Sequence, residues 1–382
     1  MKIIADENIP YVKECFSSLG RVELFPGRKI TSDTVTDADV LLVRSVTPVD
    51  SHLLKDSKVR FVGTATAGTE HIDVEFLRRS GIGFASASGA NANSVAEYIV
   101  AALLAVAKVH KTKLAGKSIG IIGAGNIGNK VADKCTALEM KVCLNDPPLE
   151  RETRDMKYRP IEQLYDCDFI TLHTPLTFEG IDKTFHLADR TFFNTLKNKC
   201  IFLNTSRGRV VDSAALKSAI KSGRLRAVVL DVWENEPNID IELLQMVDIG
   251  TPHIAGYSLD GKVAGTITLY KVMCEYFGLE TGFEAGNLLG KPKVPQLKVT
   301  LQGKHRENVV CEIIKKIYNI CQDDSNLRWI CDKTQGKRGA FFDQLRKNYP
   351  ARREFKNTRI KIEKTDAKLA KKLEGIGFLV DK

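Results

Sequence analysis

The segment KSIGIIGAGNIGNKVADKCTALEMKVCLND, residues 117–146, carries the pattern that best indicates the fold. It begins with a short apolar run that is typical of a buried parallel strand. Gly123, Gly125 and Gly128 follow in the spacing G-x-G-x-x-G, and about three turns of amphipathic sequence then predict a helix. A second apolar run ends at Asp146, which comes 18 residues after the last glycine. This order of strand, turn, helix, strand and acid is the context in which a glycine turn indicates a dinucleotide site.

Each part of this segment has a physical task in such a site. Gly123 permits the tight turn, Gly125 allows the backbone to approach a pyrophosphate, and Gly128 allows close packing of helix and strand. The helix N-terminus offers unpaired N–H groups to the pyrophosphate. Asp146 can accept hydrogen bonds from a ribose diol and would repel the 2′-phosphate of NADP, so NAD is the predicted cofactor. The alternative is a glycine turn without a ligand and an acid that only ends a strand.

Composition narrows the class of protein. A chain of 382 residues is expected to form two or three domains, and 43% hydrophobic and 27% charged residues are ordinary for a globular protein. A strand begins at residue 2, which leaves no room for a signal peptide, and no uninterrupted apolar run suggests a membrane span. The nine cysteines contain no C-x-x-C pair, which favours free thiols in the cytoplasm and predicts no metal site.

The net charge of +10 is unevenly distributed. Residues 291–382 hold 23 Lys and Arg against 11 Asp and Glu, whereas residues 1–290 hold 34 against 36. The basic excess therefore lies in the last quarter of the chain. Because this segment has no recognisable nucleic-acid-binding motif, a solvated basic surface is favoured over a nucleic-acid partner.

The order of elements predicts an α/β fold. Alternating strands and helices fill residues 1–90, and a capping box near Asn93 begins a helix so apolar that it must be buried. Six apolar strands follow from residue 117, the full number for a doubly wound parallel (Rossmann) domain. A linker over 278–295 then leads to a small α+β domain of about 296–382.

Polar residues follow each predicted strand of the second domain. These strands end near Gly123, Asp146, Thr174, Ser206, Val232 and His253. Since parallel strands end at one edge of a sheet, this edge is the expected crevice for cofactor and substrate. In the first domain, residues 44–47 and 63–69 also follow strands, and the second of these loops is suited to wrapping a carboxylate or phosphate.

Three of these strand ends carry the groups that oxidation of a hydroxy acid requires. His253 is the candidate base because its unperturbed pKa lies near working pH. Glu236 or Glu234 would hold its other ring nitrogen and favour the imidazolium. Arg207 presents a planar, permanently charged fork that matches a carboxylate. Other histidines also compete for the role of base: His71, His110 and His173.

The motifs Arg207-Gly208, Asp231…Glu236-Pro237 and Pro252-His253 are similar to those of the D-2-hydroxyacid dehydrogenase family. The resemblance also covers residues 43–47, 63–69 and 342–349, and so nearly the whole chain. It implies a catalytic trio of Arg207, Glu236 and His253 and NAD-linked oxidation of a phosphorylated hydroxy acid in pyridoxal phosphate (vitamin B6) biosynthesis. Alternatives that stay open are a dehydrogenase acting on 3-phosphoglycerate and a non-catalytic NAD-sensing regulator.

The resemblance also implies domains, partners and further site residues. It assigns residues 1–92 with about 262–285 to a flavodoxin-like substrate-binding domain, 93–261 to the NAD domain, and 286–382 to homodimerisation, with no membrane or nucleic-acid partner. The expected substrate contacts are Ser45, Thr66 and Tyr257. The basic C-terminal segment separately suggests that Arg44, together with a basic residue of 346–353 from a partner subunit, holds the substrate phosphate. The expected NAD contacts are Gly123, Gly125, Asn126, Ile127, Gly128, Asp146, Thr174, Ser206, Asp231 and Gly256.

Overall fold

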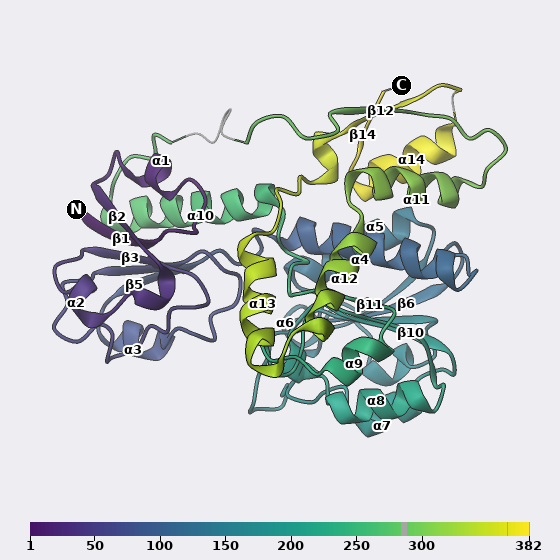
Figure 1. Cartoon of the computed structure of the whole chain (residues 1–382), viewed down its shortest axis with the longest axis horizontal. Coiled ribbons are helices and arrows are strands. Elements are labelled where there is room, and N and C mark those ends of the chain that lie inside the picture. Colours follow the sequence, from purple (N-terminus) through teal and green to yellow (C-terminus); the bar gives the residue numbers. More distant parts are fainter. Residues whose placement is uncertain (284–288, 365, 382) are drawn as a thin grey trace. The chain divides into compact units, whose positions relative to one another are not determined.

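The structure is a computed structural model that describes residues 1–283, 289–364 and 366–381 (Figure 1). The chain divides into two compact units. One contains Met1–Asn91 and Ser258–Gly290, and the other contains Ala92–Tyr257 and Lys291–Lys382. The long helix at Ser258 therefore returns the chain to the first unit, and the C-terminal segment groups with the dinucleotide-binding segment.

The first unit is built on a five-stranded parallel sheet in the order β2-β1-β3-β4-β5. This is the flavodoxin-like order 2-1-3-4-5 that the resemblance implies. Its strands are β1 (Lys2–Asp6), β2 (Arg21–Phe25), β3 (Val40–Val43), β4 (Phe61–Thr64) and β5 (Gly83–Ser86). Its helices are α1 (Val12–Phe16), α2 (Ser32–Val35), α3 (Val74–Arg79) and α10 (Leu259–Phe277).

Both faces of this sheet are buried, because alternate residues of each strand enter different cores. Ile3 and Leu42 pack with Leu269 of α10 on one face, while Ile4 and Leu41 face a second cluster. Helix α10 ends at Gly278, whose φ of +65° is the left-handed conformation that closes many helices. Helix α10 thus completes the core of a unit whose sheet is formed by the N-terminal residues 2–86.

The second unit holds a six-stranded parallel sheet in the order β11-β10-β9-β8-β6-β7. The predicted doubly wound α/β fold is confirmed, and the strand order reverses between β6 and β8, where such folds bind ligands. Beyond β7 one isolated parallel bridge, Leu144 to Tyr158, stands where the classic order has another strand. The strands are β6 (Ser118–Ile122), β7 (Lys141–Asn145), β8 (Phe169–Leu172), β9 (Cys200–Asn204), β10 (Leu225–Leu230) and β11 (Ile249–Gly250). The helices are α4 (Ala92–Val109), α5 (Asn126–Ala137), α6 (Pro147–Thr153), α7 (Arg190–Thr195), α8 (Ser213–Lys221) and α9 (Ile241–Met246).

The C-terminal segment forms a three-stranded parallel sheet and covers α4 and α5 (Figure 1). Its strands are β12 (Gln296–Val299), β13 (Arg359–Ile362) and β14 (Leu379–Asp381). Its helices are α11 (Arg306–Ile317), α12 (Ile320–Arg328), α13 (Gln335–Lys347) and α14 (Ala367–Ile376). Helices α11 and α12 pack on α4, and α14 packs on α5. The predicted α+β character of this segment therefore holds.

Helix α4 is the centre of the second unit. By length and composition it would suit a membrane, yet 78% of its apolar window is buried inside the protein. Ile99 and Leu103 belong to one core with Ile121 of the central sheet and with Val310 and Ile314 of α11. Its apolar character on every side is explained by burial between the sheet and the C-terminal helices.

Candidate active site

Three neighbouring strands of the central sheet supply the predicted trio. Arg207 follows β9, Glu236 follows β10 and His253 follows β11, and these strands pair side by side in parallel. Their carboxyl ends therefore lie along one edge of the sheet. The turns after β9 and β10 also touch directly, because a Cβ on Gly208 would lie 1.9 Å from the carbonyl oxygen of Trp233.

The side chains of His253 and Glu236 form a close pair. His253 Nδ1 lies 2.7 Å from Glu236 Oε2, and Glu236 Oε1 accepts a 2.8 Å hydrogen bond from the backbone N–H of Trp233. Burial opposes ionisation of Glu236, but His253 and the N–H of Trp233 outweigh it and lower the pKa of this carboxyl. An ionised carboxylate on Nδ1 leaves Nε2 as the nitrogen that can exchange a proton with a substrate.

The backbone of His253 is held in an uncommon conformation. Its φ is +56°, in the left-handed region that non-glycine residues rarely adopt. The buried carboxylate of Asp231 fixes the turn by accepting hydrogen bonds from the N–H groups of Ile254 and Ala255, at 2.8 and 2.9 Å. Thr251 Oγ1 lies 2.6 Å from the same carboxylate. Asp231 therefore positions His253, a role that its expected contact with NAD did not suggest.

Arg207 lies in the turn after β9, and side-chain hydrogen bonds hold this turn in place. Asn204 Oδ1 accepts from the N–H and the hydroxyl of Ser206, at 2.9 and 2.8 Å, and its amide nitrogen donates to the carbonyl of Arg207 at 3.0 Å. Arg207 Nη1 donates to the Ser206 carbonyl at 2.8 Å. Because Asn204 is fully buried, the turn can vary little, and the guanidinium is presented from a fixed base.

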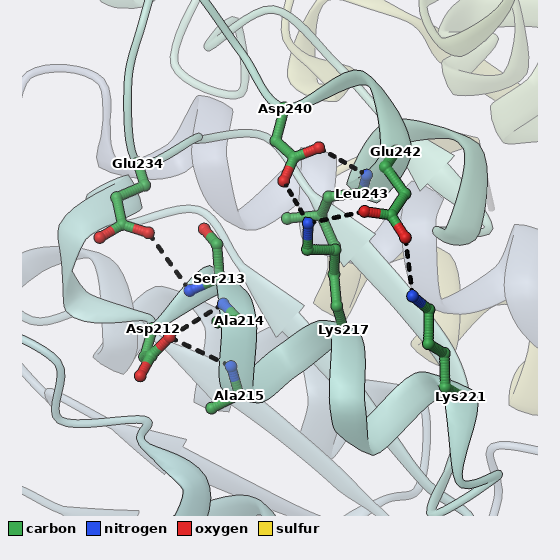
Figure 2. A network of polar contacts seen from close by, with 10 residues as sticks. All are labelled: Asp212, Ser213, Ala214, Ala215, Lys217, Lys221, Glu234, Asp240, Glu242 and Leu243. Carbon is green, nitrogen blue, oxygen red and sulfur yellow. Dashed lines mark hydrogen bonds and ion pairs between the residues drawn. The ribbon is translucent and has the colours of Figure 1, made fainter.

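Glu234, the alternative partner of the candidate base, lies elsewhere. Its Oε1 is 2.7 Å from His186 Nε2, and its Oε2 accepts from the N–H of Ser213 at 3.2 Å. Figure 2 shows this carboxylate directed at the start of α8, beside the cap formed by Asp212. The structure therefore assigns Glu236 as the partner of His253, whereas Glu234 contacts His186 and the start of α8.

The competing histidines are also occupied elsewhere. His173 Nε2 lies 3.0 Å from Thr171 Oγ1, and burial lowers the pKa of this imidazole to about 3, so it is neutral near pH 7. His110 pairs with Asp248, which precedes β11 and so lies at the opposite end of that strand from His253. His71, in the first unit, lies 3.0 Å from Thr64 Oγ1.

The glycine turn between β6 and α5 has the shape that a dinucleotide requires. A Cβ on Gly128 would meet the carbonyl oxygen of Gly123 at 2.0 Å, and Gly123 itself has a φ of +90°. Above Gly125, by contrast, a Cβ would meet nothing within 4 Å. Helix α5 begins at Asn126, so Asn126 and Ile127 form its open N-terminal turn.

Two further side chains border this turn. Asp146 Oδ2 accepts the N–H of Ala124 at 2.8 Å, and Oδ1 accepts the N–H of Leu149 at 3.1 Å as the cap of α6. Asp146 therefore stabilises the turn and caps a helix, and ribose binding by this residue stays a prediction. Thr174 Oγ1 is buried without a hydrogen-bond partner, so this hydroxyl is available to bind a ligand.

The comparisons with known proteins agree with this geometry. Residues 93–255 match the D-isomer specific 2-hydroxyacid dehydrogenase NAD binding domain, and residues 288–377 match a domain of unknown function (DUF3410). The erythronate-4-phosphate dehydrogenases of Cronobacter sakazakii and Klebsiella pneumoniae are 41% and 42% identical, over 99% of this chain and 98% of theirs. The chain belongs to the D-2-hydroxyacid dehydrogenase family. NAD-bound 3-phosphoglycerate dehydrogenase of Entamoeba histolytica shares the fold, with a TM-score of 0.62 and 22% identity over 75% of this chain and 98% of its own.

Membership of the D-2-hydroxyacid dehydrogenase family confirms the predicted enzyme class and cofactor. The matched segment is an NAD-binding domain, and it spans β6 to β11 with all three residues of the candidate trio. NAD supplies the hydride acceptor when it is bound. The open space above Gly125 and the unpartnered Thr174 hydroxyl fit such a cofactor.

The remaining predicted contacts fall into two groups. Arg44 and Ser45 follow β3 and Thr66 follows β4, so these residues share the carboxyl edge of the first unit's sheet. Thr66 Oγ1 lies 2.7 Å from Thr64 Oγ1. Gly256 and Tyr257, by contrast, follow His253 in the second unit. Whether each of these residues contacts ligand stays a prediction.

The sequence did not predict the positioning roles of Asn204 and Asp231. Asn204 has no sequence signal, because a buried Asn at a strand end belongs to no motif. The resemblance implies that Asp231 contacts NAD, whereas its carboxylate accepts hydrogen bonds from the His253 turn. Because Ile254 and Ala255 lie 23 and 24 residues after Asp231, no local sequence pattern signals this contact.

Proposed function

We propose that this enzyme oxidises 4-phospho-D-erythronate to (R)-3-hydroxy-2-oxo-4-phosphooxybutanoate with NAD, as a step of pyridoxal phosphate biosynthesis. The 2.7 Å contact between His253 and Glu236 supports it, because it supplies an oriented base at the same edge of the sheet as the cofactor turn. The names of the relatives that match along the whole chain support the choice of substrate.

The proposed roles follow from the chemistry of each side chain. Arg207 binds the substrate carboxylate with its planar fork and so fixes the neighbouring carbon and its hydroxyl. His253 Nε2 takes the hydroxyl proton as hydride leaves that carbon. Glu236, held ionised, stabilises the imidazolium that results. In the reverse direction His253 returns the proton.

Initial rates of NADH formation test the substrate assignment. The purified protein is supplied with NAD and either 4-phospho-D-erythronate or 3-phosphoglycerate, and the two values of kcat/KM are compared. A clear preference for 4-phospho-D-erythronate is expected. A preference for 3-phosphoglycerate would replace the substrate, and no NADH with any phosphorylated 2-hydroxy acid would favour the sensing regulator.

We also propose that the protein is a cytoplasmic homodimer joined through residues 286–382. The outward face of the sheet β12-β13-β14 supports this, because Lys298, Lys361 and Leu379 are exposed on it, and Leu379 is 48% exposed. Sedimentation of the full chain should give twice the mass of one subunit, and Leu379→Asp should shift the protein toward monomer. A full-length protein that sediments as a monomer at assay concentration would contradict the proposal.

A further inference from the structure

The C-terminal segment reaches the candidate active site of its own chain. A Cβ on Gly339 of α13 would lie 2.8 Å from Asn238 Oδ1, so α13 packs directly on the loop that carries Glu236. Arg352 donates a hydrogen bond to the carbonyl of Ala255, two residues beyond His253. The segment therefore supports both halves of the pair His253–Glu236 from within one subunit.

Arg346 lies between Gly339 and Arg352 in the sequence, in the last turn of α13. The Cζ atom of its guanidinium is 5.7 Å from the centre of the Tyr257 ring. Its Nε is buried and has no hydrogen-bond partner, although the residue as a whole is partly exposed. Burial opposes its charge, but Tyr257 and Glu236 outweigh this and raise the pKa of Arg346.

A buried guanidinium nitrogen without an acceptor is costly, since each such donor forgoes its hydrogen bond to water. Most buried arginines meet this cost with a carboxylate, and here Glu236 is instead bonded to His253 and to the N–H of Trp233. Tyr257 attracts the cation, but Nε keeps no acceptor. An anion at this place would supply that missing acceptor.

We propose that Arg346 of the same subunit binds the phosphate of the substrate. The inference rests on the proposed function and extends it by one binding residue. In 4-phospho-D-erythronate the carboxylate is bonded to the carbon that is oxidised, so its cation must lie near His253. Arg207 follows β9 at the same edge of the sheet, with β10 between β9 and β11. The phosphate is two carbons further away and needs a second cation. This assignment replaces the expectation that a partner subunit supplies the basic residue of 346–353.

Substrate pairs that differ only in the phosphate test the assignment. Arg346→Met keeps a shorter, unbranched apolar side chain and removes the charge. It should lower kcat/KM for 4-phospho-D-erythronate about ten- to hundredfold, as loss of a charged hydrogen bond implies. It should leave kcat/KM for unphosphorylated D-erythronate unchanged, and Arg346→Lys should restore part of the loss. Lys347→Met, an exposed neighbour on the same helix, is the matched control and should change neither value.

Inorganic phosphate gives a readout independent of turnover. Phosphate should inhibit the wild-type enzyme competitively against the substrate, and Arg346→Met should raise its inhibition constant by a similar factor while NAD affinity is kept. An equal loss with both substrates would overturn the proposal and show that Arg346 acts through Glu236. Should the wild type oxidise neither substrate, the proposed function fails, and protection from thermal unfolding by phosphate, lost in Arg346→Met, still decides whether Arg346 binds the anion.

Discussion

His253 Nδ1 and Glu236 Oε2 lie 2.7 Å apart, although the two residues come from the ends of different strands. The second carboxylate oxygen is held by the N–H of Trp233 at 2.8 Å, so the carboxylate cannot rotate without losing a bond. This arrangement fixes the imidazole and leaves Nε2 for the substrate. The orientation of the candidate base therefore depends on the relative position of the loops after β10 and β11.

His253→Ala should lower kcat by about 10²–10⁴, as removal of a general base does. Stopped-flow titration should show nearly unchanged NAD affinity, because the glycine turn is untouched. His110→Ala is the control: His110 pairs with Asp248 at the other end of β11 and should leave kcat unchanged. Near-wild-type turnover in His253→Ala would show that another residue is the base.

Glu236→Gln should lower kcat and displace the acid limb of the pH–rate profile to lower pH. The neutral amide no longer stabilises the imidazolium, so the pKa that controls the base should fall. Glu234→Gln is matched in chemistry and should keep both kcat and the profile, since Glu234 bonds to His186 and Ser213. Equal effects in the two variants would contradict the assigned partnership.

Arg207→Lys should reduce kcat/KM more than an exchange of like charges normally does, because the planar fork is lost. Arg209→Lys, two residues away, is the control, since Arg209 lies over the rings of Phe178 and Phe185. Steady-state rates over a range of substrate concentrations separate the two variants. An unchanged kcat/KM in Arg207→Lys would remove Arg207 from the site.

Two alanine substitutions in the glycine turn should have opposite consequences. Gly128→Ala places a methyl group 2.0 Å from the Gly123 carbonyl oxygen and should lower the free energy of unfolding by about 1–3 kcal/mol. Gly125→Ala meets no protein atom within 4 Å and should leave stability unchanged. Gly125→Ala should weaken NAD binding about tenfold or more by obstructing the pyrophosphate. Calorimetry of both variants measures the stability and the NAD affinity. Unchanged NAD binding in Gly125→Ala would refute the approach of the pyrophosphate to Gly125.

The neutral imidazole of His173 should make the protein less stable in acid. Its pKa is lowered to about 3 in the folded state, whereas the unfolded imidazole takes up a proton below about 6.5. The unfolded state therefore binds more protons, and stability should fall as pH drops below 6.5, by at most about 2 kcal/mol at pH 5. Denaturant titrations should show a shallower pH dependence in His173→Gln, and an unchanged slope would contradict the burial of a neutral imidazole.

The sequence predicted the parts of the site that local patterns encode. The glycine spacing, the strand ends, Arg207 and His253 follow from short motifs with known chemistry. The choice between Glu234 and Glu236 did not, because both follow the same strand and only the path of the loop directs one toward His253. The proximity of Arg346 to Tyr257 depends on packing between distant segments, for which a single sequence carries no signal.

Burial of α4 under the C-terminal helices has a consequence for how the protein is made. Leu104 and Cys311 approach each other across 207 residues of sequence. During synthesis the apolar surface of α4 therefore emerges long before α11 and α12 exist to cover it. Contacts between such distant segments form slowly and leave apolar surface open to aggregation meanwhile. A nascent chain that stops after its last catalytic residue would carry the full trio and an uncovered core helix, so we expect it to depend on chaperones.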